Sequence, residues 1–147
     1  MIDVLFLHLS LVTSALVAGG LALVSLGIVR AGRTLDARSW PELHRALDTT
    51  IGPYMSRVLA LAILAVTGLA ISASGSRVHF AVAAALFAGV LAISVSVNVP
   101  LNRAVAHWTV PPPTWERTRA RWNTFQHLRA TLALVGFAVV VVGSGAS

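Results

Sequence analysis

Four apolar segments, each long enough to cross a lipid bilayer as a helix, constrain this chain more than any other feature. A membrane-spanning helix needs about 20 predominantly apolar residues. Segments of that kind cover residues of about 4–29, 53–73, 79–97 and 122–143. The sequence therefore predicts an all-α fold, a four-transmembrane-helix bundle that forms a single domain over residues 1–147.

Charged residues are few and unevenly placed. Only 11% of the residues are charged, whereas a soluble domain carries about a quarter. All eleven basic residues are arginines, and most lie in two connections between apolar segments rather than on one soluble face. We therefore expect no nucleic-acid partner. The chain has no cysteine, which excludes disulfides, thiolate metal sites and a cysteine nucleophile.

The arginines also predict the orientation of the bundle. Loops 30–52 and 98–121 carry four arginines each, whereas the opposite side carries only Arg77. Because positively charged loops stay in the cytoplasm, we expect both loops there and both termini outside, in a bacterial plasma membrane. Small residues at every fourth position, such as Ser14 and Ala18, permit a homo-oligomer.

The first loop contains a predicted short helix of its own. Ser39 can cap it, and Glu42 follows three residues later, as in a capping box. We expect a short interfacial helix over about 41–50, separate from the transmembrane helix that begins near Pro53. His44 lies on it, either as an exposed interfacial residue or as a group that reaches over the mouth of the bundle.

The most unusual pattern lies around the start of the last apolar segment. Trp115, Arg119, Trp122, Gln126 and Arg129 follow one another at intervals of 4, 3, 4 and 3. On a helix these intervals keep all five side chains within a stripe about 80° wide. Such a stripe is not core packing. It indicates a polar, aromatic face, although the tryptophans alone are also typical of an interfacial belt.

Arg129 is the strongest single signal. It lies seven residues after Trp122, which places it about 10 Å into the bilayer. A charge in hydrocarbon costs about 2.5–3.5 kcal/mol on insertion scales, so Arg129 should face the bundle interior. Asn98 and Asn102 are the expected partners. Because we expect no carboxylate at that depth, Arg129 either binds an anionic ligand or bonds to helix-end carbonyls. The two asparagines have an alternative role as well, because with Pro100 between them they can simply end the third helix.

Metal ligands are less evident. His44, His107 and His127 are the histidines on the loop side, and no His-x₃-His or Glu-x-x-His pair exists. We therefore predict no metal ligands and no cofactor, while a haem or copper site with ligands from different helices stays open.

The polar residues resemble those of the anthrone oxygenase-like family of small four-helix membrane proteins. The first loop is also similar in the order Leu35-Asp36, His44 and Met55. One difference is Gln126, because the family commonly has histidine in that position. The carrying motif consists of Asn98, Pro100, Asn102, Trp115, Arg119, Trp122 and Arg129.

The resemblance implies the oxidation of a lipophilic polycyclic phenol, such as an anthrone, by O₂ to a quinone without metal or flavin. A base removes an acidic proton, and hydrogen-bond donors stabilise the resulting oxyanion. His44 or His127 would be the base, and Trp115, Trp122 and Gln126 would bind the substrate. The expected oxyanion donors are Asn98, Asn102, Arg119 and Arg129.

Two other functions remain open at this stage. In the first, the polar cluster belongs to a non-catalytic membrane subunit, or to a protein that binds a small molecule or a lipid. A haem- or copper-binding protein of the same fold is the third alternative. In each case the expected partners are the lipid bilayer and a small molecule, which for an enzyme is a lipophilic aromatic compound.

Overall fold

The computed structural model describes residues 2–73 and 75–146, and the described part is helical with no strand. Consecutive helical segments join into four long rods. The all-α, four-helix prediction is confirmed. The segments are α1 (Ile2–Leu23), η1 (Val24–Ile28), α2 (Val29–Ala31), η2 (Gly32–Thr34), α3 (Ser39–Ser72), α4 (Arg77–Ile93), η3 (Ser94–Asn98), α5 (Val99–Ala106) and α6 (Trp115–Gly145).

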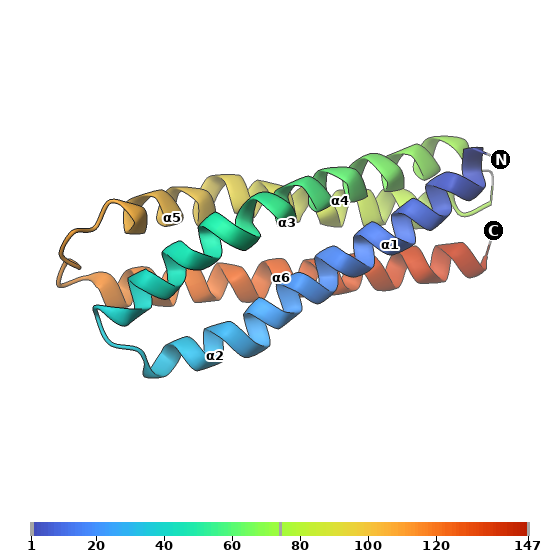
Figure 1. Ribbon diagram of the computed structural model, residues 1–147. Coiled ribbons are helices and arrows are strands. Elements are labelled where there is room, and N and C mark those ends of the chain that lie inside the picture. Colours follow the sequence, from blue (N-terminus) through green and yellow to red (C-terminus); the bar gives the residue numbers. More distant parts are fainter. Residues whose placement is uncertain (1, 74, 147) are drawn as a thin grey trace.

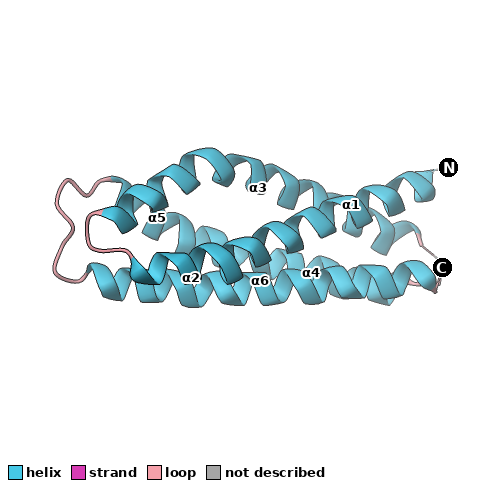
Figure 2. Ribbon diagram, turned by 60° about the horizontal axis from the view of Figure 1, so that its bottom comes forward, coloured by secondary structure: helices cyan, strands magenta, loops and turns pink. Residues whose placement is uncertain are grey.

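The rods lie side by side and antiparallel, with both termini at one end of the bundle (Figure 1). The two long loops lie at the other end (Figure 2). α1 packs against α3 and α6, and α4 packs against the same two helices. The four rods therefore form a ring in which α1 and α4 are diagonal.

Each rod is long and apolar enough to cross a membrane, which identifies an integral membrane protein by length and composition. The spans are Val4–Thr34, Ser39–Ser72, Arg77–Ala106 and Trp115–Gly145. Every span exceeds the roughly 20 residues that cross a hydrocarbon core. The rods are longer than predicted, mainly at the end nearest the two long loops.

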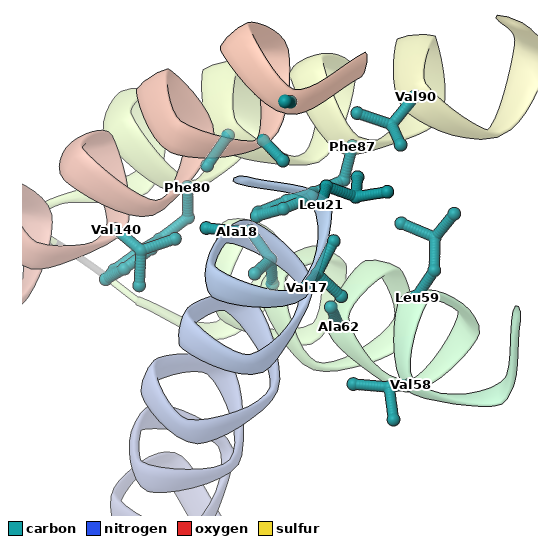
Figure 3. Packing of buried hydrophobic residues seen from close by; sticks show 14 of the residues in the cluster. Val17, Ala18, Leu21, Val58, Leu59, Ala62, Phe80, Phe87, Val90 and Val140 are labelled. Carbon is teal, nitrogen blue, oxygen red and sulfur yellow. The ribbon is translucent and has the colours of Figure 1, made fainter. Parts of the chain in front are cut away.

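The hydrophobic core fills the half of the bundle nearest the termini. Figure 3 shows Val17 of α1, Ala62 of α3 and Phe87 of α4 among its members. Gly136 lets α6 approach closely, because a Cβ atom there would lie 3.2 Å from the Phe87 ring. In lipid no hydrophobic driving force brings helices together, so close packing at small residues contributes to their association instead.

Two predicted boundaries are wrong. The segment predicted as a separate helix over 41–50 is the beginning of α3, which continues through Pro53. Proline inside a helix is tolerated in membrane proteins. The third rod does not end near residue 97 but continues past Pro100 to Ala106.

The start of α3 is also capped differently from the prediction. Arg38 precedes the first residue of α3, and its side chain makes no capping bond. The Asp36 carboxylate accepts the backbone N–H groups of Ser39, at 2.7 Å, and of Arg38, at 3.1 Å. The bond from the Ser39 backbone is the main reason why the pKa of Asp36 lies below its ordinary value. α3 begins at Ser39, five residues before the buried His44.

Candidate functional site

A cavity of about 380 Å³ lies in the half of the bundle nearest the long loops, and all four rods contribute to its wall. Its size falls in the range of small-molecule sites, about 300–1,000 Å³. The wall is mostly apolar, with one set of polar and aromatic side chains. These are His44, Asp48, Ser56, Ser94, Asn98, Asn102, Trp122, Gln126 and Arg129.

Two π-helical turns border this cavity, one in each of the diagonal rods. Val24 of η1 and Asn98 of η3 both line it. π-turns insert one extra residue into a helical turn and are frequent at functional sites. Beyond such a turn the side chains are rotated relative to an ideal α-helix, so both Asn98 and Asn102 reach the cavity.

The first polar cluster joins three rods around Asn102 of α5. Its Oδ1 atom accepts the Trp122 indole N–H and contacts His44 Nε2, both at 2.9 Å. Its Nδ2 atom donates to Asp48 Oδ1 at 2.5 Å. A histidine, a carboxylate and an amide are thereby held together at the loop end of the cavity.

Aromatic rings enclose His44 and close this end of the bundle. The imidazole is 4% exposed and lies 5.0 Å from the Trp40 ring and 4.8 Å from the Trp122 ring, measured between centroids. Trp40 also contacts Trp108 and Trp115. The prediction that His44 reaches over the bundle mouth is therefore closer to the structure than an exposed interfacial position.

The second polar cluster surrounds Arg129, about two helical turns deeper along α6. Its Nη1 atom donates to Ser94 Oγ at 3.0 Å, and its Nη2 atom donates to Gln126 Oε1. Gln126 Nε2 in turn donates to the Leu21 carbonyl of α1 at 3.1 Å. Asn98 and Asn102, the predicted partners, are not bonded to Arg129. No carboxylate pairs with Arg129 within the described residues.

Asn98 lies at the same depth with its amide unpaired. It is 1% exposed, and neither its Nδ2 nor its Oδ1 atom has a hydrogen-bond partner in the described part of the chain. The Nε atom of Arg129 is likewise buried and unpaired. An unsatisfied buried polar group costs about 1–3 kcal/mol. The deep end of the cavity therefore offers donors and an acceptor to a polar group of a ligand.

Three predicted site residues lie elsewhere. Arg119 stacks 4.5 Å above the Trp115 ring and donates to backbone carbonyls of the first loop, including that of Leu35 at 3.0 Å. The Nδ1 atom of His127 bonds to the Ser25 hydroxyl on η1. None of Trp115, Arg119 and His127 lines the cavity.

The histidines on the loop side do not meet. His107 is exposed and its ring bonds to the Arg103 carbonyl, while His44 and His127 face different neighbours. Across residues 2–73 and 75–146, no three His, Cys, Asp or Glu side chains come together as a metal site would require.

Asp48, Ser56 and Ser94 of the cavity wall were not singled out from the sequence. Asp48 lies four residues after His44, and Ser94 lies four residues before Asn98. Residues four apart share a helix face. The spacing of four residues could have placed Asp48 beside His44 and Ser94 beside Asn98. It could be used only if both helices were known to continue through these positions.

The cavity reaches the outer surface of the bundle between α3 and the α4–η3 rod. Among its lining residues, Ile51 of α3, Leu91 of α4 and Val95 of η3 are 37%, 44% and 61% exposed. These side chains line the cavity and are also exposed at the surface of the bundle. The opening is therefore lateral and apolar.

Comparison with known proteins agrees with the resemblance noted in the sequence. The family model described as anthrone oxygenase matches residues 40–139. The matched region begins at Trp40 and includes both polar clusters. No curated protein matches the chain, and no solved structure does.

Proposed function

This chain belongs to the anthrone oxygenase family, and we propose that it oxidises a lipophilic polycyclic phenol with O₂ inside the membrane. One observation carries the proposal: a single cavity holds His44 at one end and Arg129 at the other. Along α6 the two polar clusters are separated by the seven residues from Trp122 to Arg129, which is about 10 Å. That distance suits a flat ring system with a reactive carbon at one edge and an oxygen at the other.

The proposed reaction begins with proton removal. His44 takes a proton from a ring carbon that lies opposite a ketone or phenol oxygen. The electron pair moves through the rings to that oxygen, where Arg129 and the Asn98 amide stabilise the negative charge. Donors aimed at a developing oxyanion in a site without water typically contribute more than any other single effect.

O₂ then oxidises the electron-rich anion. The carbanion passes electrons to O₂ and forms a carbon–oxygen bond, which gives a hydroperoxide after the proton returns. Loss of water from the hydroperoxide leaves a carbonyl, so one CH₂ and one O₂ become one C=O and one H₂O. This sequence needs no group other than the substrate anion and O₂, and we propose that no cofactor takes part.

The access route supports a lipophilic substrate. The opening beside Ile51 and Val95 lies on the lateral surface of the bundle. A polycyclic compound dissolved in the lipid therefore reaches the cavity directly. We place this half of the bundle at the cytoplasmic side, because the arginine-rich loops lie at the same end.

A second function, binding without catalysis, is favoured by Gln126. This residue occupies the position where the family commonly has histidine. Its Oε1 atom accepts a hydrogen bond from Arg129, and its Nε2 atom donates one to the Leu21 carbonyl. A protein that holds an anionic lipophilic molecule needs Arg129 but no base. His44→Gln separates the two functions, since a binder keeps its affinity and has no turnover to lose.

The test is O₂ uptake and quinone formation by the purified protein in lipid nanodiscs, with a hydroxylated anthrone as substrate. We expect turnover by the wild type, a loss of more than 100-fold in His44→Gln, and little change in His107→Gln, whose ring is exposed outside the cavity. Ligand binding without turnover by the wild type would support the binding function instead. Stoichiometric metal or a haem absorption band in active protein would overturn the cofactor-free reaction.

A further inference from the structure

The Asn102 amide lies between two groups whose hydrogen-bonding sense is fixed. The Trp122 indole N–H can only donate, and an ionised Asp48 carboxylate can only accept. Trp122 lies 2.9 Å from one end of the amide and Asp48 lies 2.5 Å from the other. The amide oxygen must therefore face Trp122, and the NH₂ group must face Asp48. The reverse orientation would set two donors against each other and two acceptors against each other.

The orientation of Asn102 determines which nitrogen of His44 carries the proton. His44 Nε2 lies 2.9 Å from the same amide oxygen. That oxygen accepts hydrogen bonds, so Nε2 must carry a hydrogen to form one. In a neutral imidazole the other nitrogen is then a proton acceptor. In the described part of the chain, the hydrogen bond found for the His44 ring is the one at Nε2.

We propose that Asp48 and Trp122 act through Asn102 as positioning residues that hold neutral His44 in its Nε2–H tautomer, with Nδ1 as the proton acceptor. The role of Nδ1 as the catalytic base rests on the proposed function, whereas the tautomer does not. The network joins α3, α5 and α6, so its geometry exists only in the folded bundle. It also assigns a task to Asp48, which has no part in the oxyanion end of the cavity.

The first test measures the tautomer of His44 in the wild-type protein. ¹⁵N-histidine is incorporated, and long-range ¹H–¹⁵N correlations are recorded in detergent at a pH where the imidazole is neutral. The His44 signals are identified by their absence from His44→Gln. We expect the chemical shift of a protonated nitrogen at Nε2 and of an unprotonated one at Nδ1. Protonated Nδ1 would overturn the proposal without any variant of the network.

The second test removes both fixed partners while it preserves their shapes. In the double variant Asp48→Asn with Trp122→Phe, the Asn102 amide is free to turn and can offer its NH₂ group to His44. We expect both tautomers of His44 in this variant. The matched control carries Glu116→Gln with Trp108→Phe, which lie outside the cavity, and it should keep the wild-type spectrum. A double variant that keeps only the Nε2–H tautomer would show that the two residues do not position His44.

Turnover provides a readout that separates this proposal from the proposed function. We expect kcat of the double variant to fall about tenfold, far less than the ~10⁴-fold loss when the orienting Asp of a Ser-His-Asp triad becomes Asn. An Nε2–H tautomer in a wild type that oxidises nothing would leave the positioning intact and refute the oxidase. Normal oxidation together with protonated Nδ1 would refute the positioning of His44 and leave the oxidase function standing.

Discussion

Replacement of Arg129 by methionine should greatly lower activity and change stability little. The guanidinium is a cation with no carboxylate partner in the described residues, and it lies in the cavity wall. Its two bonds go to the Ser94 hydroxyl and the Gln126 carbonyl oxygen. Methionine fills a similar volume and carries no charge. The substitution therefore removes the proposed oxyanion donor and leaves most of the packing in place.

The expected change in stability is small because two terms oppose each other. Removal of a charge from the bilayer recovers at most about 2.5–3.5 kcal/mol. The two lost hydrogen bonds cost about 0.6–1.7 kcal/mol each by the values measured inside membranes. Ser94 keeps its bond to the Val90 carbonyl at 2.7 Å. The free energy of unfolding should thus stay within about 2 kcal/mol of the wild-type value.

The expected loss of activity is large. One oxyanion donor typically contributes 10²–10³ in kcat, so kcat for a hydroxylated anthrone should fall at least about 100-fold. The measurements are O₂ uptake in nanodiscs and denaturant unfolding in detergent, with Arg121→Met as the control because Arg121 is exposed on the same helix. Turnover equal to that of the control, or a variant that does not fold, would refute the functional reading of Arg129.

Three further substitutions test other parts of the structure. Gly136→Val should lower the free energy of unfolding by about 1–3 kcal/mol, because its side chain meets the Phe87 ring; Gly19→Ala, whose Cβ meets nothing within 4 Å, is the control in the same unfolding assay. Gly52→Leu at the lateral opening should raise KM for a polycyclic substrate more than it changes kcat, measured by steady-state O₂ uptake. Asn98→Leu should weaken ligand binding at least about tenfold. It should leave the melting temperature equal or higher, because it removes two unsatisfied buried polar atoms. An unchanged affinity in a binding titration would contradict the role of the deep end of the cavity.

Local sequence patterns were sufficient for the helices and for part of the site. Hydropathy predicted the four spans, since chain length and apolar content decide which segments can cross a bilayer. Helical periodicity predicted that Trp122, Gln126 and Arg129 share one face, and all three line the cavity. The motif around these residues pointed to the family that the family model then matched.

Tertiary structure alone decided which groups meet. Arg129 bonds to Ser94 at the start of η3 rather than to the asparagines, which lie further along the same rod. His127 is one residue after Gln126, about 100° further round α6, and therefore faces Ser25 on η1 instead of the cavity. Periodicity assigns a side chain to a face of its own helix, but the partner on that face depends on the packing, register and local helical geometry of another rod.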